Sequence, residues 1–76
     1  MIEHITWKDA VSTDPWTHAD DIDSRFHMIE TCGFIIKDDE SVLIIGLNHD
    51  LDSNNWSCFI TIPKEMIVSR TKVIWR

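Results

Sequence analysis

The sequence is poor in the residues on which several classes of protein depend. Its 76 residues include only two cysteines, two glycines and two prolines. Two cysteines are too few for the disulfide framework of a small secreted domain, so we expect both thiols to be reduced inside a cell. Two glycines leave little material for a phosphate-binding or oxyanion loop. No apolar run approaches the roughly 18 residues of a membrane span, and the first residues lack the basic and apolar segments of a signal peptide.

Basic residues are also scarce, and they are unevenly placed. Seven Lys and Arg stand against 13 Asp and Glu, which gives a net charge of −6. Such a chain is not expected to bind DNA directly, because non-specific binding requires a surface that neutralises phosphates. Residues 64–76 nevertheless carry four basic residues and one acidic residue, a net charge of +3. This segment is expected either to be a solvated edge strand protected by Lys and Arg or to contact a small anionic ligand or partner.

The hydrophobic pattern divides the chain into five β-like segments. We predict strands near residues 2–7, 26–37, 41–48, 55–62 and 66–75. Between the first two, residues 8–25 form a long acidic loop, in which Asp14 and Pro15 resemble the N-cap and first position of one helical turn. Within the second segment, Gly33 predicts a bulge or a close approach of another backbone. A single tight turn is expected after Pro63.

This order of strands and turns is that of small SH3-like and Sm-like barrels. We therefore predict a single all-β domain over residues 1–76, a strongly bent five-stranded barrel with one helical turn before the last strand. The apolar residues outnumber the inward positions that such a barrel offers, because side chains alternate between the two faces of a strand. We expect the surplus to be covered by the long loop or by another copy, and so predict a homo-oligomer.

The residues that could hold a metal or carry catalysis lack the spacing for either. Four histidines and two cysteines form no CxxC, HxxxH or HxC pair, so we expect core thiols, surface histidines and no metal. The segment from Asp50 begins like a calcium loop but lacks its glycine and its final glutamate. No serine lies in a nucleophile motif. We predict no enzymatic activity, no catalytic residue and no cofactor.

The four tryptophans are the most informative residues. Trp7 and Trp56 fall at strand ends, which suit the mouth of a barrel, whereas Trp16 lies in the acidic loop, far from any periodic segment. Trp16 is expected either to fold back over the barrel as a lid or to offer a stacking surface to a planar ligand or partner. Stacking of a base on an aromatic side chain works with any base, so it suits a nucleotide ligand.

A pattern of single residues spans most of the chain. It consists of Trp7-Lys8-Asp9-Ala10, then Trp16, then the segment 30–36 (Glu-Thr-Cys-Gly-Phe-Ile-Ile), then Ile62-Pro63 and Ile67. It resembles short phage-encoded proteins with a W-x-D-A…W…T-x-G-[WF]…I-P pattern. Phe34 stands where that pattern often has a tryptophan, and Cys32 where it has an aliphatic residue. Such proteins are similar to oligomeric phage sponge proteins, which capture the cyclic oligonucleotide signals of bacterial immunity without cleaving them.

The resemblance implies a counter-defence protein of the host cytoplasm whose copies assemble and hold a cyclic nucleotide between them. In that case we expect bases to stack on Trp7 or Trp16, and Asp9 and Thr31 to hydrogen-bond base edges or ribose. The phosphates would then lie near Lys64, Arg70 and Lys72. Each residue also has a structural alternative, since Asp9 could cap a turn and Thr31 could simply fill a strand position.

Two further classes of function remain open. The protein could instead bind and block a host or defence protein through its acidic loop, in one variant by mimicking the backbone of a nucleic acid. It could also be an assembly module of a virion. An inhibitor steered by acidic residues should lose affinity sharply with salt, whereas a sponge that buries stacked bases should lose less and should melt at a higher temperature with its ligand.

Overall fold

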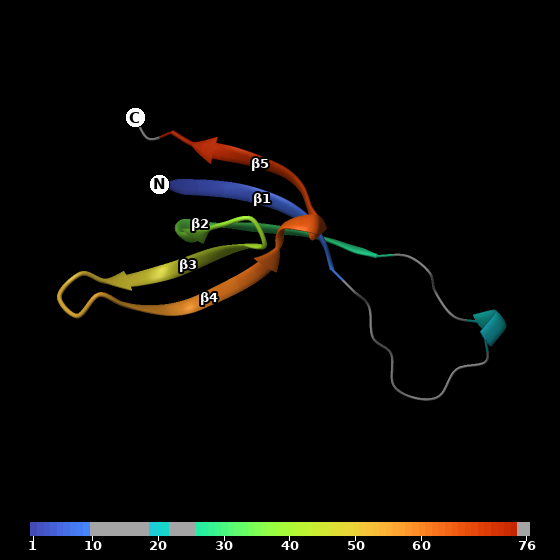
Figure 1. Ribbon diagram of the computed structural model, residues 1–76, viewed down its shortest axis with the longest axis horizontal. Helices are drawn as coiled ribbons and strands as arrows, with labels where there is room; N and C mark the ends of the chain where they lie inside the picture. Colours follow the sequence, from blue (N-terminus) through green and yellow to red (C-terminus); the bar gives the residue numbers. More distant parts are fainter. Residues whose placement is uncertain (10–18, 22–25, 75–76) are drawn as a thin grey trace.

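The computed structural model describes residues 1–9, 19–21 and 26–74, which form five strands and two 3-10 turns (Figure 1). The elements are β1 (Ile2–Asp9), η1 (Ala19–Asp21), β2 (His27–Asp38), β3 (Val42–Asp50), β4 (Asn55–Pro63), η2 (Lys64–Met66) and β5 (Ile67–Val73). The all-β class, the five strands and the helical turn before the last strand are confirmed. The turn predicted at Asp14 and Pro15 lies outside the described residues.

The strands form one antiparallel sheet in the order β4-β3-β2-β1-β5. The predicted closure into a barrel is not found, because no ladder joins β4 to β5 in the part of the chain that the structure describes. The two edge strands meet only through η2 and diverge from it (Figure 1). A three-residue turn brings the end of one strand near the start of the next, but it does not hold their far ends together.

The bend of the sheet is concentrated in β2. Residues 27–34 of this strand pair with β1, whereas residues 34–38 pair with β3, and the register shifts between Ile35 and Lys37. At Gly33 an added Cβ would lie 2.7 Å from the carbonyl oxygen of Gly46. The close approach predicted at Gly33 is therefore confirmed, and it allows β3 to cross tightly over β2.

The turn between β2 and β3 is fixed by a local carboxylate. Asp39 Oδ1 accepts hydrogen bonds from the backbone N–H groups of Ser41 and Val42, at 2.8 and 2.9 Å. These bonds hold the pKa of Asp39 below its ordinary value, because backbone donors favour the charged carboxylate. The hairpin between β2 and β3 is thus built by an aspartate that bonds its own turn.

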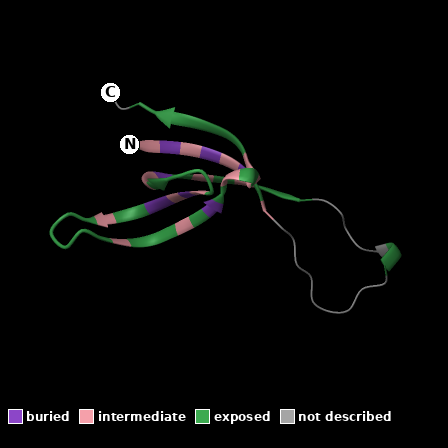
Figure 2. Ribbon diagram, in the orientation of Figure 1, coloured by how far each residue is buried: buried purple, intermediate pink, exposed green. Residues whose placement is uncertain are grey.

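The core lies on one face of the sheet. Its buried members are Ile5, Trp7, Leu43, Ile45 and Ile62, and partly buried neighbours pack against them. Burial alternates along β1, whereas β5 has no buried residue (Figure 2). The two thiols predicted for the core, Cys32 and Cys58, are exposed. That prediction was wrong because the open sheet does not enclose these parts of β2 and β4.

Candidate functional site

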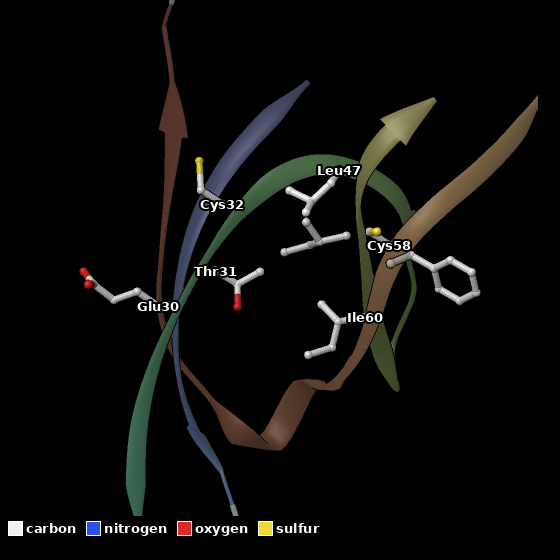
Figure 3. Close-up of a pocket in the computed structure, with 8 residues that line it drawn as sticks. Glu30, Thr31, Cys32, Leu47, Cys58 and Ile60 are labelled. Carbon is white, nitrogen blue, oxygen red and sulfur yellow. The ribbon is translucent and has the colours of Figure 1, made fainter. Parts of the chain in front are cut away.

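A groove of about 350 Å³ lies against β2, β3 and β4. Its volume is in the range of pockets for small molecules. Thr31, Leu47 and Ile60 point toward its interior, whereas Glu30 points away (Figure 3). The residues that line it are Glu30, Thr31, Cys32, Ile45, Leu47, Cys58, Phe59 and Ile60. The walls are therefore mainly apolar, and Thr31 adds a hydroxyl group to the lining.

One of the predicted ligand residues, Thr31, lines this groove, and a second, Trp7, is hydrogen-bonded to Thr31. The indole Nε1 of Trp7 donates a hydrogen bond to Thr31 Oγ1 at 3.0 Å, which joins neighbouring strands β1 and β2. The Trp7 side chain belongs to the core and is buried. The predicted stacking of a base on Trp7 stays a prediction.

Two predicted phosphate ligands, Arg70 and Lys64, meet elsewhere, in an ionic cluster with two carboxylates. Arg70 donates to both oxygens of Glu3, from Nε and Nη2, with both distances 2.8 Å. Its Nη2 also donates to Asp38 Oδ2 at 2.9 Å, and the ammonium of Lys64 contacts the same carboxylate. Glu3 is only 4% exposed, although it lies in an otherwise open sheet. The cluster ties together β1, β2, η2 and β5.

The electrostatics of this cluster follow from its hydrogen bonds. The guanidinium of Arg70 holds the pKa of Glu3 below its ordinary value, against the opposing effect of burial. Hydrogen bonds from Arg70 and Lys64 lower the pKa of Asp38 to about 2. The two carboxylates in turn raise the pKa of Arg70. Arg70 and Lys64 are thus engaged with internal carboxylates, and a phosphate would have to compete with these partners.

The remaining predicted residues are spread over the molecule. Lys72 is exposed on β5 and is the cross-strand partner of Glu3. Asp9 ends β1 opposite His27, and Trp16 lies outside the described residues. The two groups that the structure does assemble are distinct, because Trp7 and Glu3 are four residues apart on β1, or roughly 13 Å.

Sequence reasoning missed an aromatic cluster near the β3–β4 hairpin. His49 and Trp56 are cross-strand partners whose rings stack with centroids 4.0 Å apart and planes at 1°. Phe34 also contacts Trp56, with ring centroids 6.0 Å apart and planes tilted by 56°. A Cβ on Gly46 would lie 2.5 Å from the Trp56 ring, so the glycine makes room for it. Only the register of the hairpin, counted back from its turn, could have paired these residues in advance.

Comparison with known proteins adds no relative. No family model, curated protein or solved structure matches the chain. Within residues 1–9, 19–21 and 26–74, no helix has the length and apolar character needed to cross a membrane.

Proposed function

We propose that this protein is a non-enzymatic binding protein whose copies assemble and sequester a cyclic nucleotide signal. The observation that carries the proposal is the open groove beside Thr31, whose size and apolar walls suit a planar heterocycle. The proposed role is the counter-defence function of the phage sponge proteins that the sequence resembles. A protein with this role would act in the host cytoplasm.

The hydrogen bond between Trp7 and Thr31 supports a specific role for Thr31. Because its oxygen accepts from the Trp7 indole, the hydroxyl proton is available to donate elsewhere. An acceptor on a nucleobase, such as a ring nitrogen or carbonyl oxygen, would complete this network. Trp7 would then act by orienting the hydroxyl while remaining in the core.

Phosphate binding would draw on the basic segment. Lys72 is exposed, and Arg70 could keep its two bonds to Glu3 while exchanging Asp38 for a phosphate oxygen. The exchange replaces one charge-assisted hydrogen bond with another, so it need not break the pairing of β1 with β5.

The order of the five strands and the turn before β5 support a further proposal, that the fold is an open relative of the SH3-like and Sm-like barrels.

Calorimetric titration of the whole chain with a panel of cyclic di- and trinucleotides tests this function. We expect one of them to bind, and Thr31→Val to weaken it about 5–10-fold, the equivalent of one neutral hydrogen bond. Thr6→Val is the matched control, because Thr6 alternates with the core residues Ile5 and Trp7 on β1. If no nucleotide binds below high micromolar concentration, sequestration is wrong and the protein-inhibitor hypothesis becomes the leading one.

A further inference from the structure

The two edges of the sheet differ in their protection against pairing. β4 contains no charged residue over Asn55–Pro63, and Phe59, at its midpoint, is 60% exposed. β5 carries Arg70 and Lys72. Charged side chains on an edge strand oppose pairing with a like strand, whereas a long uncharged edge is a template for pairing. β4 is therefore the edge that most needs a partner strand, along the segments on either side of Cys58, whose φ of 55° interrupts the ladder.

The charges beside the two edges indicate which strand that partner is. The β3–β4 turn places Asp50 and Asp52 just before β4, whereas Lys72 lies near the end of β5. In an antiparallel arrangement, the start of β4 in one copy lies beside the end of β5 in another. The acidic turn of one copy then meets the basic end of the next.

We propose that the occupant of the β4 edge is β5 of a second copy of this chain, paired antiparallel. This proposal rests on the self-association in the proposed function and specifies its interface. Pairing β5 with β5 would oppose two basic strands, and pairing β4 with β4 would join two chains of net charge −6 without using their basic segment. Only the β4–β5 contact sets opposite charges against each other while it satisfies the unpaired backbone of both edges.

Such an interface has consequences for assembly and for the groove. It uses different surfaces on the two copies, so the same contact repeats from copy to copy, and closure into a ring would leave no edge unpaired. Three residues of the groove wall, Cys58, Phe59 and Ile60, belong to β4. The basic β5 of each neighbour therefore borders the groove, which places cations from a second copy beside a ligand.

A charge swap tests the interface by sedimentation velocity. We expect the wild-type chain to sediment as an oligomer. Lys72→Glu and Asp52→Lys should each raise the dissociation constant roughly tenfold or more, since each turns an attraction into a repulsion. An equimolar mixture of the two variants should recover the wild-type size, because the two new residues attract each other. Lys8→Glu, which makes the same change of charge at the far end of β1, is the control and should sediment like the wild type.

The outcomes separate this proposal from the function on which it rests. If the wild-type oligomer is unaffected by both substitutions, or if the mixture of folded variants does not recover, β4–β5 pairing is wrong while self-association stands. A wild-type monomer overturns both the interface and the self-association. Nucleotide titration of the wild-type chain and of Asp52→Lys then reports on ligand binding, whereas Lys72→Glu is left out of this comparison because Lys72 is itself a proposed phosphate ligand. Far-ultraviolet circular dichroism of each variant shows whether the sheet is intact.

Discussion

β1 and β5 are neighbours in the same sheet, yet they are held in opposite ways. β1 is a central strand, and Glu3, Ile5 and Trp7 on one of its faces are buried. β5 is an edge strand with no buried residue, although it contains isoleucine and two valines. β1 is held by apolar packing, whereas β5 packs against the core only through Ile67 at its start and is otherwise held by its ladder and by Arg70, whose guanidinium reaches back to Glu3. Position in the sheet, more than apolar content, therefore decides what stabilises a strand.

The largest loss of stability is expected when a core side chain of β1 is truncated. Ile5→Ala removes a side chain that is 0% exposed and belongs to the same core cluster as Leu43 and Ile45. We expect the free energy of unfolding to fall by about 2–5 kcal/mol, from lost transfer energy and the cavity left behind. Urea denaturation measures the change. Val73→Ala on β5 should cost less than about 1 kcal/mol, and equal losses at both sites would contradict the contrast.

The next largest loss of stability is expected where β3 passes close to β2 at Gly33. Gly33→Ala sets a methyl group 2.7 Å from the backbone oxygen of Gly46, and a backbone cannot move aside as a flexible side chain can. We expect a loss of about 1–3 kcal/mol, as for other overpacked sites. Gly46→Ala instead meets the ends of the Trp56 and Ile36 side chains. A Gly33→Ala protein that melts at the wild-type temperature would show that the backbones of β2 and β3 are not closely packed at this position.

Weakening the ion pair between Glu3 on β1 and Arg70 on β5 should lower the free energy of unfolding by a comparable or smaller amount. Glu3→Gln keeps the shape of the side chain but replaces a two-oxygen contact to the charged Arg70 with a neutral amide. We expect the free energy of unfolding to fall by about 1.5–3 kcal/mol in urea denaturation, the range for hydrogen bonds to charged groups. Glu65→Gln, at an exposed position in η2, is the control and should change stability by less than about 0.5 kcal/mol. If both variants unfold alike, Arg70 does not anchor β5 through Glu3.

The pH dependence of stability gives the most graded test. The folded protein holds the pKa of Asp38 at about 2, below its ordinary 3.8, and also lowers the pKa of Glu3. The stabilisation from these depressed values is complete above the unfolded pKa values and is lost as pH falls through the folded ones. We expect the melting temperature to fall as the pH drops from about 4 toward 2. Asp38→Asn should flatten this dependence, and an unchanged slope would rule out a contribution from Asp38.

The candidate site shows where local sequence patterns stop being informative. Thr31 was predicted as a ligand residue, and the structure places it in the groove wall. Arg70 and Lys64 were predicted as phosphate ligands from the net charge of their segment, but the structure pairs them with Glu3 and Asp38. A count of charges reports which cations a segment has, whereas their partners depend on strands that lie far away in the chain.

The sequence by itself determined the five strands, the turns between β2 and β3 and before β5, and the need for glycine at position 33. These features follow from alternation of side chains and from bonds within a few residues, such as those of Asp39 to its own turn. Only the tertiary structure decided that the sheet stays open, that Cys32 and Cys58 are exposed, and that Arg70 pairs with Glu3. Arg70 and Glu3 are 67 residues apart, so their contact depends on the register of β1 against β5, which no local pattern encodes.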